Sequence, residues 1–277
     1  MKTTVAIAGL GSRGRITYAP FASLHPDKME ITAAADIDPG ALRETAKTYH
    51  IPEERCFTSA EELLAQPKMA DAVFICTQDR DHVSQALTAL ERGYHILMEK
   101  PISPDPSECR RLLEASKKYD RKIVVCHVLR YTPFFSRMKE LIASGIIGDV
   151  VTIQAIENVG YWHQAHSFVR GNWRNSETTS PMCLQKTCHD FDLYLWLADK
   201  TPLRVSSMGN TWLFKESCAP EAPRSAVSTA VPQRTPAPST QKKSTLQTKR
   251  PALPAATPNG RWMYWLSSRL RRRSMMP

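Results

Sequence analysis

The chain has 277 residues, 42% of them hydrophobic, which suffices for one large or two ordinary domains; no apolar run approaches the roughly 20 residues of a membrane span. Its net charge of +10 lies entirely in residues 217–277, which hold 11 Lys and Arg and one acidic residue, so the neutral remainder argues against a nucleic-acid-binding protein. The chain has seven cysteines without a C-x-x-C pair, which indicates reduced thiols and argues against a zinc or other metal site. Reduced thiols and the lack of a secretory leader both predict a cytoplasmic protein.

Short apolar segments alternate with amphipathic segments through residue 125. We expect strands within residues 4–10, 31–38, 70–77, 95–101 and 122–128. We expect helices after Gly14 and within residues 38–50, 61–66, 81–93 and 105–120. Strands that alternate with helices of this length indicate an α/β Rossmann domain, with a doubly wound parallel sheet, over residues 1–125.

The first strand leads into three glycines at G-x-G-x-x-G spacing, Gly9, Gly11 and Gly14. In a dinucleotide site the first permits a tight turn, the second lets the backbone approach a pyrophosphate, and the third allows close helix packing. Asp36 ends the second strand, where an acid accepts from the adenosine ribose. The alternative is a structural glycine turn.

The cofactor predicted from this loop is NAD, because the Asp36 carboxylate would repel the 2′-phosphate of NADP. Arg13 or Arg15 could offset that repulsion, so NADP stays open. Ser12 and Arg13 lie inside the loop and are assigned to the cofactor with the glycines.

The pattern changes beyond residue 125. Residues 133–148 and 181–200 are typical of helices, whereas residues 149–159 and 203–214 are predicted to be strands of an antiparallel sheet. We therefore expect a second, incomplete α+β domain over residues 126–216, which binds the substrate.

Several motifs together resemble the glucose–fructose oxidoreductase / inositol dehydrogenase (Gfo/Idh/MocA) family over residues 1–215. They are GLGSRG at 9–14, MEKPIS at 98–103, VVCHVLRYTPFF at 124–135, ASGIIGDV at 143–150 and CHDFDLYLWL at 188–197. The resemblance implies a nicotinamide-binding Rossmann domain, a second domain facing the substrate, and reversible oxidation of a secondary alcohol on a small polyol, sugar derivative or cyclitol. A homo-oligomer is usual for such proteins.

Two residues are the candidates for catalysis. Oxidation of an alcohol requires a base at the hydroxyl, and His189 titrates in the right range. Lys100, at a strand end beside the cofactor, can donate to the same oxygen, and its bond to Pro101 is a candidate cis peptide. The structural alternatives are a solvated Lys100 and a His189 paired with Asp192.

The chain departs from the family pattern at Gln185, where many members carry an aspartate four residues before the histidine. An amide can form hydrogen bonds but cannot take a proton. A changed substrate or an acid/base role for the adjacent Lys186 would fit this departure.

Softer candidates surround these residues. Those assigned to the cofactor are Thr77, Gln78, His82 and Glu99, although His82 is as compatible with a purely structural role. Those assigned to the substrate, besides Gln185 and Lys186, are Arg130, Tyr131, Trp162 and His163, and the last two lie in an aromatic segment that suits a sugar ring or merely packs on its own domain.

Residues 217–277 are basic and proline-rich, and we expect them to be disordered. Either they form a disordered basic tail that binds nucleic acid or an acidic surface, or the reading frame slips near residues 220–224. Acidic residues and hydrophobic periodicity are lost in mid-domain, which favours the slip. A slip would remove strands from the second domain, impair turnover and put the usual oligomer in doubt. A non-catalytic dinucleotide-binding or regulatory protein is the competing functional class.

Overall fold

The computed structural model describes residues 2–218, which fall into two units, residues 2–206 and residues 207–218. No helix within this part of the chain is long and apolar enough to cross a bilayer. The second unit contains one 3-10 turn, η5 (Glu216–Cys218). The predicted disorder of the basic tail concerns residues that lie, apart from 217 and 218, outside the described range.

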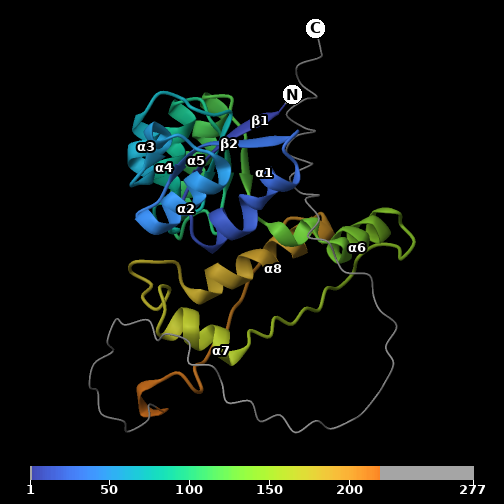
Figure 1. The fold of residues 1–277 in the computed structure, drawn as a ribbon. Coiled ribbons are helices and arrows are strands. Elements are labelled where there is room, and N and C mark those ends of the chain that lie inside the picture. Colours follow the sequence, from blue (N-terminus) through green and yellow to red (C-terminus); the bar gives the residue numbers. More distant parts are fainter. Residues whose placement is uncertain (1, 219–277) are drawn as a thin grey trace, which may run out of the picture. The chain divides into compact units, whose positions relative to one another are not determined.

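The first unit is built on a parallel sheet of six strands in the order β3-β2-β1-β4-β5-β6 (Figure 1). Crossovers on both sides of the first strand make the sheet doubly wound, so the predicted Rossmann domain is confirmed. The strands are β1 (Thr3–Ala8), β2 (Met29–Ala35), β3 (Cys56–Phe57), β4 (Ala72–Ile75), β5 (His95–Met98) and β6 (Ile123–Val125).

Helices cover both faces of this sheet. Alternate residues of one strand point to opposite faces, and Ala6 packs against α3, α4 and α5 while Ile7 packs against α1 and α2. Both side chains are fully buried, which explains the nearly continuous apolar strands. The helices are α1 (Pro20–Leu24), α2 (Pro39–Tyr49), α3 (Ala60–Ala65), α4 (His82–Glu91) and α5 (Pro106–Lys118), with a 3-10 turn η2 (Glu53–Arg55) before β3.

The first helical segment after β1 is a π-helical stretch, η1 (Ser12–Tyr18), which begins before Gly14. The expectation of a helix starting after Gly14 was therefore wrong. The Arg15 amide donates to the Gly11 carbonyl at 3.0 Å, so the loop closes into helix at once and Gly14 lies within the first turn.

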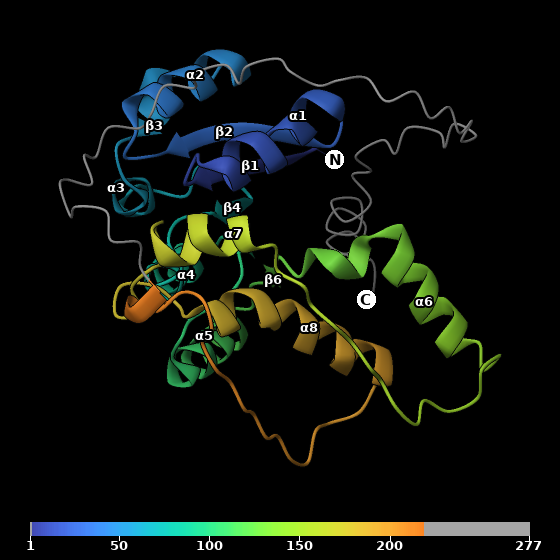
Figure 2. The same cartoon turned by 90° about the horizontal axis from the view of Figure 1, so that it is seen from below.

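The regular elements after β6 in the described chain are all helices or helical turns. A 3-10 turn, η3 (Val128–Tyr131), leads to α6 (Pro133–Ala143), which starts on a proline with the Thr132 hydroxyl accepting from the Phe135 amide. Helix α6 packs against α8 (Figure 2). The remaining elements are α7 (Tyr161–Gln164), a π-helical turn η4 (Ala165–Val169) and α8 (Met182–Ala198).

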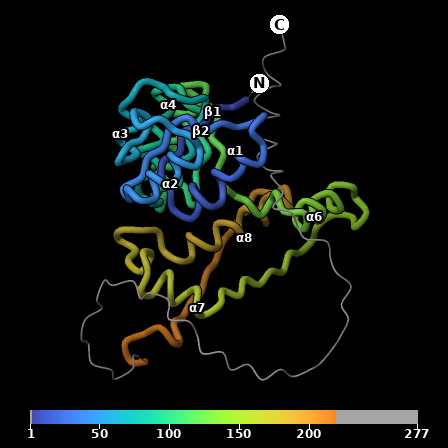
Figure 3. The backbone as a smooth tube through the Cα atoms, viewed as in Figure 1, coloured from blue at the N-terminus to red at the C-terminus, as the bar shows by residue number. Residues whose placement is uncertain are grey.

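Two predicted strands do not form. Residues 149–159 run as an irregular trace between α6 and α7 (Figure 3), and residues 203–214 hold no strand either. A strand needs a hydrogen-bonded neighbour, and no segment within residues 2–218 pairs with these two. Their apolar side chains consequently face solvent, as at Val151 (93% exposed) and Leu203 (96% exposed).

Candidate active site

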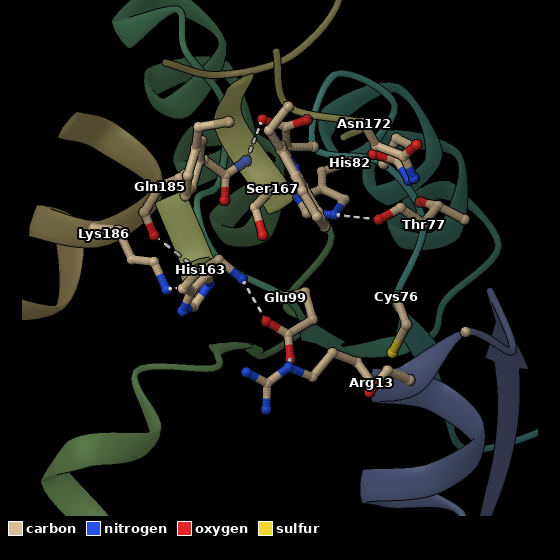
Figure 4. A pocket seen from close by; sticks show the side chains of 17 residues that line it. Arg13, Cys76, Thr77, His82, Glu99, His163, Ser167, Asn172, Gln185 and Lys186 are labelled. Carbon is tan, nitrogen blue, oxygen red and sulfur yellow. Dashed lines mark hydrogen bonds and ion pairs between the residues drawn. The ribbon is translucent and has the colours of Figure 1, made fainter. Parts of the chain in front are cut away.

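A cavity of about 440 Å³ opens at the carboxyl ends of β1, β4 and β5, opposite α7, η4 and the start of α8 (Figure 4). This is the edge where doubly wound sheets bind ligands. Eleven of the residues singled out in the sequence line it: Gly11, Ser12, Arg13, Thr77, Gln78, His82, Glu99, Lys100, His163, Gln185 and Lys186.

The other seven candidates do not line the cavity. Gly9 and Gly14 are the glycines of the loop that pack closely against backbone, and Asp36 supports the loop. The remaining four residues, on η3, α7 and α8, are Arg130, Tyr131, Trp162 and His189.

The glycine loop has the geometry of a cradle. A Cβ added at Gly14 would lie 1.9 Å from the Gly9 carbonyl oxygen, and one at Gly9, whose φ is +92°, would lie 2.6 Å from the Cys76 backbone. A Cβ at Gly11 would meet nothing within 4 Å. Two glycines therefore allow close packing, and the third leaves open space beside the cavity, which fits a bound pyrophosphate.

Asp36 holds this loop in place. Its carboxylate accepts hydrogen bonds from the Leu10 amide and, at 2.7 Å, from the Asp38 amide. Both nearby arginines already have acidic partners, since Arg15 pairs with Glu44 and Arg13 lies 3.7 Å from Glu99. Neither arginine is paired with Asp36, whose charge therefore favours NAD over NADP.

Glu99 is buried beneath the cavity. Its carboxylate accepts from the Tyr18 hydroxyl and, at 3.1 Å, from the Lys100 amide. Burial, followed by the neighbouring Cys126 and Glu99, raises the pKa of Tyr18, so the phenol stays protonated as a donor. Glu99 thus fixes the backbone that carries Lys100.

His82 is buried at the base of the site, between two backbone carbonyls. It is 1% exposed, and its two ring nitrogens lie 2.9 Å from the Pro101 carbonyl and 3.3 Å from the Thr77 carbonyl. Burial lowers its pKa. The Lys100–Pro101 bond is cis, as predicted. His82 therefore joins the ends of β4 and β5, although its ring also borders the cavity.

Lys100 is not a free lysine. Its ammonium donates to the Gln185 carbonyl of α8 at 2.9 Å. This contact connects the Rossmann sheet with the second lobe, by which we mean the elements from η3 to α8 within the first unit. The Gln185 side chain in turn donates to Asp79 at 2.8 Å.

Sequence reasoning overlooked Asp79. This residue is 3% exposed, and its Oδ2 also accepts from the Ser180 amide at 2.7 Å, while its Oδ1 has no partner within the described residues. Its place four residues after β4 was a usable signal, because strand ends line such sites. Many family members carry an aspartate at the position of Gln185, four residues before His189. In this chain a carboxylate reaches the same place from the opposite lobe, because Asp79 accepts a hydrogen bond from the Gln185 side chain.

Lys186 and His163 form a second pair at the cavity. The Lys186 ammonium lies 3.1 Å from Nε2 of His163, and because an ammonium can only donate, the imidazole accepts. Burial and then the Lys100 charge lower the pKa of Lys186; burial and then Lys186 lower that of His163.

His189 lies near this wall without entering it. Burial, and next the ammonium of Lys100, lower its pKa to about 4, so the imidazole is neutral near pH 7. Its Nδ1 is buried without a partner in the described chain, and its ring meets that of His127 edge to face at 6.0 Å.

The alternative pairing of His189 with Asp192 is not the contact that forms. Asp192 instead accepts two hydrogen bonds from Arg130, at 2.6 and 2.5 Å. This fork, together with the Arg130 guanidinium over the Trp196 ring at 5.5 Å, joins η3 to α8 and explains why Arg130 does not reach the cavity.

Aromatic rings form a row along the second lobe. Trp162 stacks on His163, which stacks on Phe168 at 6.4 Å, and Phe168 packs on Trp173 at 6.4 Å. The last three line the cavity, whereas Trp162 is 66% exposed and supports the row from outside.

A doubly wound sheet with a glycine cradle, an acid after β2 and a lysine after β5 defines a dinucleotide-binding protein with a second, ligand-facing lobe. Residues 3–127 match the "Oxidoreductase family, NAD-binding Rossmann fold", and residues 135–230 match the "GFO/IDH/MocA C-terminal domain". The chain therefore belongs to the Gfo/Idh/MocA oxidoreductase family. The second match runs past the predicted slip near residues 220–224, and the slip stays a prediction.

Two curated relatives illustrate the family. Inositol 2-dehydrogenase of Corynebacterium glutamicum (strain R) is 31% identical over 62% of this chain and 48% of that protein. The 1-carboxy-3-chloro-3,4-dihydroxycyclohexa-1,5-diene dehydrogenase of Comamonas testosteroni is 26% identical over 75% of this chain and 50% of that protein. The chain spans about half the length of the curated relatives it matches.

Solved structures agree on the fold. Apo scyllo-inositol dehydrogenase of Lactobacillus casei superposes with a TM-score of 0.61 at 25% identity, over 72% of this chain and 55% of that one. The same enzyme with bound NAD(H) and scyllo-inositol gives a TM-score of 0.63 at 24% identity, over 72% of this chain and 57% of that one.

Proposed function

We propose that this chain is an NAD-dependent dehydrogenase that oxidises a secondary alcohol of a sugar, a sugar derivative or a cyclitol. The observation that carries the proposal is the position of Lys100, which lies in one cavity with the glycine loop on one side and α8 on the other. The family and the inositol dehydrogenases among its relatives support the same reaction class.

The cofactor would be held by Gly11, Ser12 and Arg13 at its phosphates, with Thr77 and Gln78 further along the same cavity. Asp36, outside the cavity lining at the end of β2, would hold the adenosine ribose. When bound, NAD supplies the hydride acceptor of the reaction. The chain's own residues must then bind the alcohol, exclude water and remove the hydroxyl proton.

Lys100 is suited to bind the alcohol oxygen. One of its three ammonium hydrogens is used by the Gln185 carbonyl, which leaves two for a substrate oxygen. A positive charge beside that oxygen stabilises the alkoxide that develops as the proton leaves.

His189 is the proposed base, a role that requires its ring to reach the substrate hydroxyl from beside the cavity, which it does not line. Its imidazole is neutral near pH 7 because burial and the Lys100 charge lower its pKa, so it can accept a proton. Gln185 does not compete with His189 for this role. Its amide cannot take a proton, and its side chain is hydrogen-bonded to Asp79. The cavity-lining aromatic rings would pack against a sugar or cyclitol ring.

Two measurements test the proposal. The full chain is mixed with NAD and a panel of polyols, including scyllo-inositol and myo-inositol, and formation of NADH is followed by its near-ultraviolet absorbance. NAD binding is measured separately by calorimetry. Binding with turnover supports the dehydrogenase. Binding without turnover of any polyol in the panel favours the non-catalytic class, and absence of NAD binding contradicts both.

A further inference from the structure

The cavity carries a positive charge that hydride transfer does not require. Lys186, the fifth residue of α8, points at His163, from α7, and the two side chains meet on the wall of the second lobe (Figure 4). An ammonium whose hydrogen-bonding partner is a neutral imidazole keeps its full charge and two unused hydrogens. Both side chains are half-buried, so water solvates that charge only in part.

The carboxylates of the cavity are engaged elsewhere. Glu99 accepts from the Tyr18 hydroxyl and the Lys100 amide, and it lies 3.7 Å from Arg13. Asp79 accepts from Ser180 and Gln185. Within residues 2–218 no ion pair joins Lys100 or Lys186 to a carboxylate. The charge of Glu157 raises the pKa of Lys186 by less than burial and the charge of Lys100 lower it, so Glu157 does not compensate the ammonium. A partly desolvated ammonium without a counterion is unfavourable unless a ligand supplies one.

The cofactor is poorly placed to supply that counterion. Its pyrophosphate belongs at Gly11 and the loop that carries Arg13, and Figure 4 shows Arg13 and Lys186 on opposite sides of Glu99. Lys186 instead shares its wall with His163, Phe168 and Trp173, whose rings suit the apolar face of a sugar or cyclitol.

We propose that Lys186 and His163 bind an oxyanion of the substrate, a carboxylate or a phosphate, so that the enzyme acts on an acidic sugar or cyclitol derivative. The inference rests on the proposed function and names its substrate class. Lys186 donates to one anion oxygen. His163 takes a proton from solvent when the anion binds, so that its Nε2 no longer accepts from Lys186 and donates to a second anion oxygen. The ring of the substrate lies along Phe168 and Trp173, which directs a hydroxyl toward Lys100.

Equilibrium binding tests this without requiring turnover. Glucose, glucuronate and glucose 6-phosphate are titrated into the NAD-loaded full chain by calorimetry at low ionic strength. We expect at least one acidic ligand to bind about tenfold or more tightly than glucose, as a charge-assisted contact predicts, and the two acidic arms separate carboxylate from phosphate. In Lys186→Met this preference should fall to near unity, and Lys186→Arg should retain most of it.

Lys200→Met is the matched control, because Lys200 is exposed just beyond the far end of α8 and should leave the preference unchanged. Equal binding of the three ligands to the wild type, including no detectable binding of any, would overturn the proposal. So would a preference that survives in Lys186→Met. Loss of NADH formation with neutral and acidic substrates alike in Lys186→Met, with binding intact, would assign Lys186 to proton transfer instead. Failure of NAD itself to bind would refute the proposed function separately.

Discussion

The ammonium of Lys100 donates to the main-chain carbonyl of Gln185 at 2.9 Å, so the proposed catalytic lysine is positioned by backbone from the opposite lobe. A backbone acceptor does not depend on the identity of the side chain at position 185. The Gln185 side chain is free to serve a different contact, the hydrogen bond to Asp79.

Lys100→Met should abolish turnover while NAD binding persists, because the thioether keeps the length of the side chain and removes the positive donor. We expect a loss of kcat of about 10²-fold or more, as for removal of an oxyanion-stabilising donor. Stopped-flow kinetics and calorimetry with NAD measure the two effects. Lys100→Arg retains the charge and should recover part of the activity. Turnover by Lys100→Met at the wild-type rate would remove Lys100 from the mechanism.

Asp79→Ala should destabilise the chain by about 1–3 kcal/mol, because the buried Ser180 amide and the Gln185 side chain both lose their acceptor. Both donors bind the same oxygen, so Asp79→Asn can keep both hydrogen bonds through its amide carbonyl and is the matched control. Urea unfolding measures stability, and kcat is compared with KM. If Ala and Asn behave alike in stability, the hydrogen bonds are not the reason for the burial of Asp79.

The glycines of the loop should separate into two classes on replacement by alanine. Gly9→Ala and Gly14→Ala should cost at least about 2 kcal/mol, because their Cβ atoms would lie 2.6 and 1.9 Å from backbone atoms. Gly11→Ala should preserve stability and weaken NAD binding, because its Cβ meets open space where the cofactor is expected. Thermal melts with and without NAD distinguish the classes. Equal destabilisation by all three substitutions would contradict this assignment.

Stability should fall as the pH drops from about 6.5 to about 4. The folded-state pKa of His189 is lowered from 6.5 to about 4, so in that window the unfolded chain binds the extra proton and protonation favours unfolding. The contribution is fully present above pH 6.5 and is lost as the pH falls through about 4. His82 and His127, whose pKa values are also lowered, act in the same direction.

Denaturant unfolding across this pH range measures the slope, and His189→Gln should reduce it. An unchanged slope in that variant would mean that His189 titrates normally in the folded chain.

The unpaired segment between α6 and α7 should promote self-association. Val151 and Ile156 are 93% and 75% exposed on a stretch with strand-like sequence and no hydrogen-bonded neighbour in the described chain. Val151→Lys with Ile156→Lys should lower light scattering at high protein concentration and leave the melting temperature nearly unchanged. A large drop in melting temperature would show instead that these side chains are buried in solution.

The Rossmann half was predictable because its signals are local. Each of these signals depends on a few neighbouring residues: an apolar strand, glycines at fixed spacing, and an acid at the end of β2. Gly14 is an example, because it lacks a Cβ and so leaves room for the carbonyl of Gly9, five residues earlier. The motif around Lys100 and the helix that carries His189 were also visible in the sequence.

The rest depends on pairs that are distant in the chain. Asp79 meets Gln185 across 106 positions and Arg130 meets Asp192 across 62, and neither partner carries a local signal of the other. The strand prediction for residues 149–159 failed for the same reason, since an alternating pattern shows a segment's capacity to pair and only the fold decides whether a neighbour is there. Sequence by itself thus determined five of the six strands of the sheet, all but the two-residue β3, together with the glycine cradle and the candidate chemistry. Tertiary structure alone decided which side chains share the cavity, because long-range hydrogen bonds and burial select partners that spacing along the chain does not.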